Sequence, residues 1–174
     1  YLPNTLVNEG INHINIQYVN NYKKTGTGLH KFVDPADGKE YLYSQFAIFH
    51  AHRTFPWFDQ PDIKAWLNLT MITPVENVAI SNSMESLEAK FTEKPDFCNS
   101  FVKNKNMNEA VKAFPGNYKI TNFNSELPMS TYLFVIISGP YNILERFWEI
   151  PGREDHLRMR FACRESLKKH AIKV

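Results

Sequence analysis

The chain has 174 residues and a mass of 20.3 kDa, and hydrophobic residues make up 43% of it. A chain of this size buries roughly 70% of its unfolded surface when it folds, so it needs neither a disulfide framework nor a structural metal to hold a core. Its 20 basic and 18 acidic residues give a net charge of +2, which favours neither nucleic acid nor an acidic membrane surface as a partner.

Short segments in which apolar and polar residues alternate dominate the sequence, a pattern typical of strands with one buried face. In chain order these segments are residues 14–19, 41–46, 67–71, 87–91 and 118–123. A continuously apolar run, which predicts a central strand buried on both faces, occupies residues 132–137. The last two predicted strands are residues 143–150 and 157–162. Turns rich in Gly, Pro and Asp separate the segments, so we predict an all-β fold, a sandwich or saddle of mostly antiparallel strands.

Two segments depart from this alternation. We predict an insertion with a short helix at residues 97–116, because helix-compatible residues occur within it. Residues 164–174 are also rich in helix formers, with Leu167 and Ala171 on one stripe. We expect residues 1–163 to form the β domain and residues 164–174 to begin a helical linker into a further domain.

Few residues suggest chemistry of their own. No two of the six histidines have the four-residue spacing of the zinc motif His-Glu-x-x-His. His50 and His52 would share one face of a strand and offer two nitrogens to a metal, but no third ligand is evident, and we interpret them as surface histidines. Asp59 and Asp62 flank Pro61, and we interpret them as turn-forming residues rather than a pair of catalytic carboxylates.

The cysteines and the hydropathy indicate the cellular compartment in which we expect the protein. Cys98 and Cys163 form neither a disulfide framework nor a metal motif, and we expect two reduced thiols in a reducing compartment, which we take to be the cytoplasm. No apolar stretch approaches the roughly 20 residues of a membrane-spanning helix, so we expect no membrane segment.

Longer and more specific patterns lie mostly in the first half of the chain. They read GTGLHKFVDP at residues 26–35, EYLYSQF at 40–46 and HRTFPWFDQPDIKA at 52–65, followed by ISN at 80–82 and PMSTYL at 128–133. Over about residues 6–169, these motifs resemble the N-terminal domain of the zinc aminopeptidases related to aminopeptidase N and leukotriene hydrolase, the gluzincin metallopeptidases. The string RFACRES at residues 160–166 resembles the crossing from this domain into the catalytic domain.

The resemblance implies a β-saddle domain without catalytic residues. In the family, the zinc motif, a later zinc-binding Glu and the Gly-x-Met-Glu-Asn loop belong to the following catalytic domain, and none of them is in this sequence. The chain is then a fragment, incomplete at its N-terminus, that binds no zinc or other cofactor and is inactive alone. Its partners would be its own missing catalytic domain and, for the parent enzyme, the N-termini of peptides, from which it releases amino acids.

Two residues are implicated in substrate binding by the resemblance alone. In the family, a Gln at the position of Gln45 lines the pocket for the first side chain of the substrate. Two residues later, a Glu or Gln holds the free α-amino group, but this chain has Ala47, whose methyl group cannot accept a hydrogen bond. Losing a charged hydrogen bond costs about 1.5–3 kcal/mol. Trp57, where the family often has Cys, is interpreted as a packing residue.

Two functional interpretations remain open at this point. If the glutamates of the catalytic domain suffice to hold the amino group, the chain belongs to an active aminopeptidase. If they do not, the parent has weakened, altered or lost activity, and the domain serves as a structural or protein-interaction module within a larger assembly.

Overall fold

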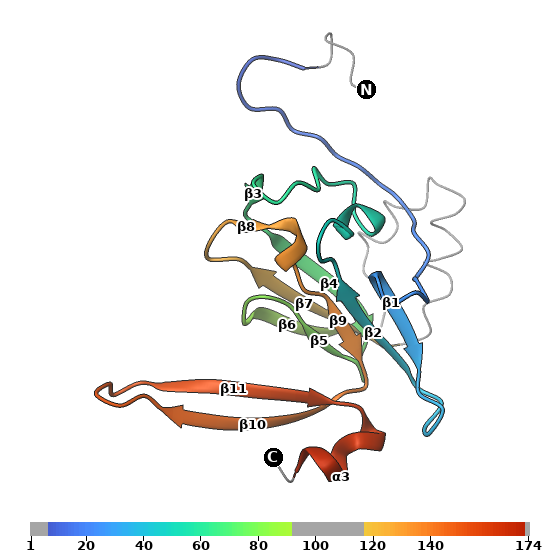
Figure 1. Ribbon diagram of the computed structural model, residues 1–174, viewed down its shortest axis with the longest axis vertical. Helices are drawn as coiled ribbons and strands as arrows, with labels where there is room; N and C mark the ends of the chain where they lie inside the picture. The colour runs from blue at the N-terminus through green and yellow to red at the C-terminus, as the bar shows by residue number, and fades with distance from the viewer. Residues whose placement is uncertain (1–6, 92–116, 173–174) are drawn as a thin grey trace.

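The computed structural model describes residues 7–91 and 117–172 (Figure 1). In this part of the chain, the strands form small sheets whose ladders are antiparallel throughout. The prediction of an all-β fold of mostly antiparallel strands is therefore confirmed. The predicted helical insertion at residues 97–116, and with it Cys98, lies outside the described residues.

Two larger sheets form the body of the domain. One has four strands in the order β1 (Gly28–Val33), β2 (Glu40–Gln45), β9 (Ile137–Gly139) and β5 (Val78–Ile80). The other has three strands in the order β4 (Asn68–Pro74), β7 (Tyr118–Asn124) and β6 (Glu85–Phe91). Strand β2 is central to the first sheet, with β1 on one side and β9 on the other, so its position is fixed along both edges.

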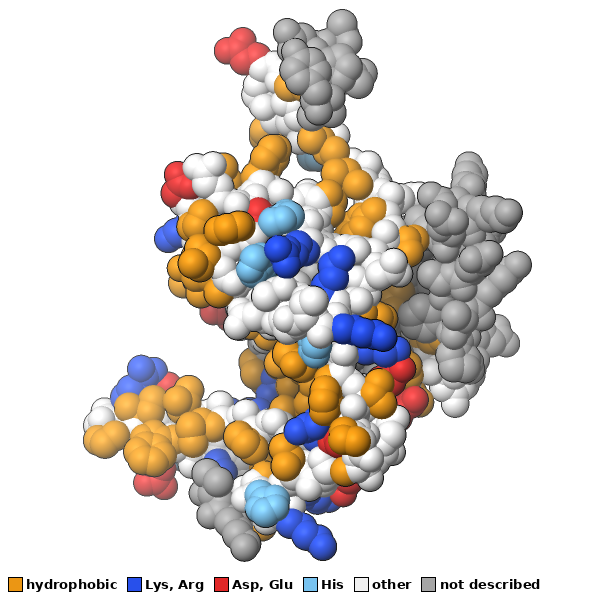
Figure 2. Space-filling view, turned by 45° about the vertical axis from the view of Figure 1, so that its right-hand side comes forward, with side chains coloured by type: hydrophobic (Ala, Val, Ile, Leu, Met, Phe, Trp, Pro, Cys, Tyr) orange, Lys and Arg blue, Asp and Glu red, His pale blue; other side chains and the backbone are white. Residues whose placement is uncertain are grey.

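Two two-stranded ribbons complete the β structure. The shorter one pairs β3 (Lys64–Ala65) with β8 (Met129–Ser130). The longer one is a hairpin of β10 (Asn142–Glu149) and β11 (His156–Cys163), which projects below the two larger sheets in Figure 1. Apolar side chains gather along this hairpin on the face seen in Figure 2.

The core lies between the two larger sheets. Its fully buried members are Phe46, Ala51, Phe134 and Ile136. Half-buried apolar side chains from β1 and β4 pack against this cluster and so join the sheets: Leu29, Leu69 and Met71. Trp57 also packs here, with its ring stacked on Phe55 at 4.7 Å, in agreement with the interpretation of Trp57 as a packing residue.

Two strand predictions are wrong. Residues 14–19 are not a strand, because their backbone has no ladder partner among the described residues, and Ile14 and Ile16 are 58% and 51% exposed. The apolar run 132–137 is not one central strand either. It begins within a 3-10 turn, η4 (Thr131–Leu133), and only its last residue belongs to β9. Phe134 is buried there, but Leu133 is 51% exposed, so the run faces two environments.

Short helical turns follow the hairpin. A 3-10 turn, η5 (Glu165–Leu167), leads into α3 (Lys168–Ala171), as the helix-forming composition of this segment predicts. We refer to residues 164–172 as the outgoing segment, because they carry the chain away from β11. Among the helices of the described residues, none is long and apolar enough to cross a membrane.

Candidate functional site

The two residues implicated by the resemblance lie together on one exposed turn. Gln45 is the last residue of β2, and the buried Phe46 separates it from Ala47. The Ala47 backbone N–H donates a hydrogen bond to Gln45 Oε1 at 3.1 Å, and the Ala47–Ile48 peptide bond is cis. The hydrogen bond from Ala47 to Oε1 orients the Gln45 carboxamide over the turn and does not use the Nε2 donors of that side chain.

Buried residues on both sides hold this turn in place. Phe46 is 1% exposed and packs against the ring of Phe134, and Ala51, which begins the 3-10 turn η2 (Ala51–Arg53), is fully buried. The His50 N–H donates to the Phe46 carbonyl oxygen at 2.9 Å and closes the loop. Residues 47–49, which lie between the buried Phe46 and Ala51, are exposed at the surface.

A buried carboxylate fixes the next part of the loop. The Asp59 side chain, only 6% exposed, accepts hydrogen bonds from the His52 backbone N–H and Nδ1, both at 2.9 Å, and from Thr131 Oγ1 at 2.6 Å. Burial raises the pKa of Asp59, but the hydrogen bonds from Thr131 and His52 outweigh burial and leave the pKa below its ordinary value. Asp59 thus ties the loop after β2 to η4, a role that its interpretation as a turn residue missed.

The histidine pair does not form the arrangement considered for a metal. His50 and His52 lie at the start of η2 and not on a strand, and His52 Nδ1 is engaged by Asp59. Among the described residues, no group of three or more His, Cys, Asp or Glu side chains is placed to hold a metal ion.

An apolar groove of about 230 Å³ adjoins the loop beside the β3–β8 ribbon. Phe58 and Trp66, 77% and 68% exposed, stand at its rim. Its two hydroxyl groups are already engaged, since Ser130 Oγ donates to the Pro61 carbonyl oxygen at 2.5 Å and Thr131 Oγ1 donates to Asp59. The groove therefore offers apolar surface rather than reactive groups.

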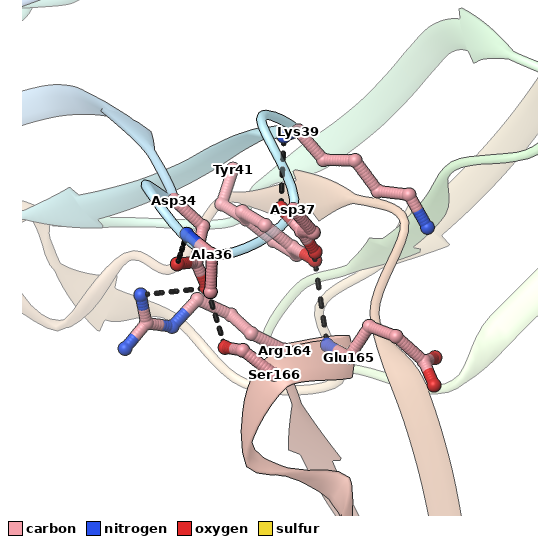
Figure 3. A network of polar contacts seen from close by, with 8 residues as sticks. All are labelled: Asp34, Ala36, Asp37, Lys39, Tyr41, Arg164, Glu165 and Ser166. Atoms are coloured by element: carbon pink, nitrogen blue, oxygen red, sulfur yellow. Dashed lines mark hydrogen bonds and ion pairs between the residues drawn. The ribbon is translucent and has the colours of Figure 1, made fainter.

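A second polar cluster lies at the opposite end of β2 (Figure 3). Asp34, whose side chain is 4% exposed, accepts hydrogen bonds at Oδ2 from Ser166 Oγ at 2.5 Å and from Arg164 Nη1 at 3.1 Å. At Oδ1 it accepts one from the Ala36 N–H at 3.0 Å. These interactions, led by the hydrogen bond from Ser166, hold the pKa of Asp34 below its ordinary value.

Tyr41 strengthens the same connection. Its ring is fully buried, and its hydroxyl group donates to Asp37 Oδ2 at 2.9 Å and accepts from the Glu165 N–H at 3.4 Å. The Arg164 guanidinium lies 4.6 Å from the centre of the Phe32 ring, within the range of a cation–π interaction. The β1–β2 turn and the outgoing segment are therefore joined by several independent contacts.

Comparisons with known proteins agree on one family. Residues 1–107 match the family model described as the peptidase M1 N-terminal domain. The chain is 32% identical to aminopeptidase N of Streptomyces lividans over 149 residues, which are 86% of this chain and 14% of that protein. It is 30% identical to aminopeptidase N of Canis lupus familiaris over 131 residues, 70% of this chain and 11% of that protein.

A plant relative extends the comparison. The chain is 26% identical to aminopeptidase M1 of Arabidopsis thaliana over 154 residues, which are 88% of this chain and 14% of that protein. The chain thus spans no more than 14% of the length of any of these three relatives.

Proposed function

This chain belongs to the peptidase M1 N-terminal domain family, and on that premise we propose that it is the non-catalytic β domain of a zinc-dependent aminopeptidase. The family is zinc-dependent in general, and its catalytic domain supplies the zinc. A zinc-activated water would hydrolyse the first peptide bond of the substrate in the parent enzyme. The names of the relatives and the absence of His-Glu-x-x-His from this sequence support this division of labour.

The observation that carries the proposal is the exposed turn at the end of β2. Gln45 and Ala47 are exposed on either side of the buried Phe46, and the buried Ala51 anchors the far end of the turn. In our proposal, Gln45 lines the pocket for the first side chain of the substrate, and Ala47 occupies the position that faces the α-amino group. A rigidly anchored turn suits this role, because substrate-lining groups act only when they are held in position.

We also propose a domain boundary after residue 163. Residues 1–163 constitute the β domain, and residues 164–174 begin the connection to the catalytic domain. The outgoing segment supports this boundary, since the strands give way to the turns η5 and α3 after Cys163.

Peptidase assays test the proposal directly. The purified chain and the longer parent polypeptide are each incubated with zinc and a fluorogenic leucine or alanine amide. We expect turnover by the parent and none by the chain. Hydrolysis by the chain alone, lost on chelation, would show that the domain has a catalytic site of its own.

Ala47 also favours a second candidate function. If the parent no longer cleaves peptides, the domain is a structural or protein-interaction module of a larger assembly. The downstream sequence discriminates the two: an intact His-Glu-x-x-His with its later Glu supports the enzyme, and its loss supports the module.

A further inference from the structure

One strand connects the two sites described above. β2 carries Tyr41, which binds the outgoing segment, near its start and Gln45 at its end. Gln45 lies four residues after Tyr41, a distance of about 13 Å, since a strand rises about 3.3 Å per residue. Because β1 and β9 flank β2, this strand moves as part of a sheet and not as a flexible tether.

Polar contacts hold the first residues of the outgoing segment, 164–166, on the sheet, whereas its later residue Ala171 is buried. An open hollow of about 350 Å³ lies between the segment and the sheet, lined by side chains that include Tyr141, Phe161 and Leu167. Leu167 is 42% exposed, so its apolar contribution to docking is small. The hydrogen bonds of Asp34 and Tyr41, together with the one that Asn142 Nδ2 donates to Glu165 Oε2 at 2.5 Å, supply directional restraint on residues 164–166.

Asp34 is the centre of this restraint. Its carboxylate binds the side chains of Ser166 and Arg164, while its third acceptor bond, from Ala36, keeps it in the β1–β2 turn. A carboxamide at this position would keep the shape but could not accept both donors at one charged oxygen. Loss of the charge should weaken the contacts of Asp34 with both Ser166 and Arg164.

We propose that Asp34, with Ser166 and Tyr41, is a positioning clamp that fixes the direction in which the chain leaves the domain relative to Gln45. This inference rests on the proposed function, in which the outgoing segment leads to the catalytic domain and Gln45 lines its pocket. The clamp acts through geometry, and none of its members touches substrate.

A distance measurement on the chain itself tests the clamp independently of activity. Spin labels at Ala47→Cys and Leu167→Cys, in a Cys98→Ser, Cys163→Ala background, report the separation between the exposed turn and the outgoing segment. We expect one narrow distance distribution, which Asp34→Asn broadens. Ser166→Ala, which removes a single hydrogen bond, should broaden it less and provides a milder variant if Asp34→Asn unfolds the chain.

Asp155→Asn is the matched control. It makes the same chemical change in the exposed Arg153–Asp155 pair of the hairpin turn and should leave the distribution narrow. Hydrogen exchange of residues 165–172 should rise about tenfold or more in Asp34→Asn, the effect of losing a charge-assisted hydrogen bond. Unchanged distances and exchange in both Asp34→Asn and Ser166→Ala, with the fold intact, would overturn the clamp.

Kinetics of the parent enzyme test the consequence for substrate binding. Asp34→Asn should raise KM and alter the preference between leucine and alanine substrates more than it lowers kcat, whereas Asp155→Asn should change neither. Equal kinetics for wild type and Asp34→Asn would overturn the positioning role. A wild-type parent without turnover would instead refute the proposed function, and the distance distribution would still decide the clamp.

Discussion

Ala47 is the residue on which the choice between the two candidate functions depends. It lies on the exposed turn beside Gln45, where a longer side chain would extend into solvent without disturbing the core. A methyl group contributes neither charge nor a hydrogen-bond acceptor to an ammonium group. If position 47 faces the α-amino group, as we propose, an active parent holds that group with side chains from its catalytic domain.

Ala47→Glu in the parent enzyme should restore the missing contact. We expect kcat/KM for aminoacyl amides to rise about tenfold or more, the effect of one charge-assisted hydrogen bond. Ile48→Glu, which places the same charge on the neighbouring, 68% exposed position, is the control and should have little effect. An unchanged kcat/KM in Ala47→Glu would mean that position 47 does not face the amino group.

At this scale, local sequence patterns identify residues but not their distant partners. The family motifs place Gln45 and Ala47 two residues apart, and the structure shows them on one turn. Asp59 was interpreted only as a turn residue because its partner Thr131 is 72 residues away along the chain. Asp34 and Ser166 are separated by 132 residues, so no local pattern predicts their hydrogen bond.

The β10–β11 hairpin shows how one element can carry two different faces. Residues directly opposite each other share a face, and one face pairs Leu144 with Phe161 and Trp148 with Leu157. The other face is charged. There Arg160 donates to Glu85 of β6 at 2.5 Å, with both side chains about one-fifth exposed, and so fastens the hairpin to the three-stranded sheet.

A double-mutant cycle should show that this ion pair contributes to stability. We expect a coupling free energy of about 1 kcal/mol between Arg160→Met and Glu85→Gln in urea unfolding, because the pair is partly shielded from water. The exposed Arg153–Asp155 pair is the matched control and should couple by less than about 0.5 kcal/mol. Equal coupling in the two pairs would mean that β6 does not anchor the hairpin.

The strand predictions succeeded where a pairing partner exists. Both hairpin strands were predicted, the second of them from alternation, but the same alternation in residues 14–19 did not produce a strand. A strand is stabilised by its neighbour as well as by its own pattern. Strand β1 was missed although it has a partner, since Gly26, just before it, and Gly28, its first residue, favour a turn.

At the scale of the whole molecule, three partly buried carboxyl groups make stability depend on pH. Hydrogen bonds led by that of Ser166 lower the pKa of Asp34 below its ordinary value. Burial raises the pKa values of Asp59 and Glu85, but their hydrogen bonds outweigh burial, and both pKa values lie below their ordinary values. All three groups therefore favour the folded state when they are ionised.

Acidification should consequently destabilise the chain. A lowered pKa in the folded state gives stability that is complete above the unfolded pKa and is lost as the pH falls through the folded pKa. We expect the urea midpoint to be steady between pH 7 and 5 and to fall below about pH 4. The triple variant Asp34→Asn, Asp59→Asn, Glu85→Gln should show a flatter profile, and a wild-type midpoint that stays constant to pH 3 would contradict the assignment.

The orientation of β2 also determines how far Gln45 moves when the strand rotates at its other end. A strand that pivots by about 5° at Tyr41 moves Gln45, about 13 Å away, by about 1 Å. Displacements of this size at a reacting centre can reduce a rate about 100-fold. Under the proposed function, a substitution in the β1–β2 turn therefore changes activity from a distance, through the orientation of β2.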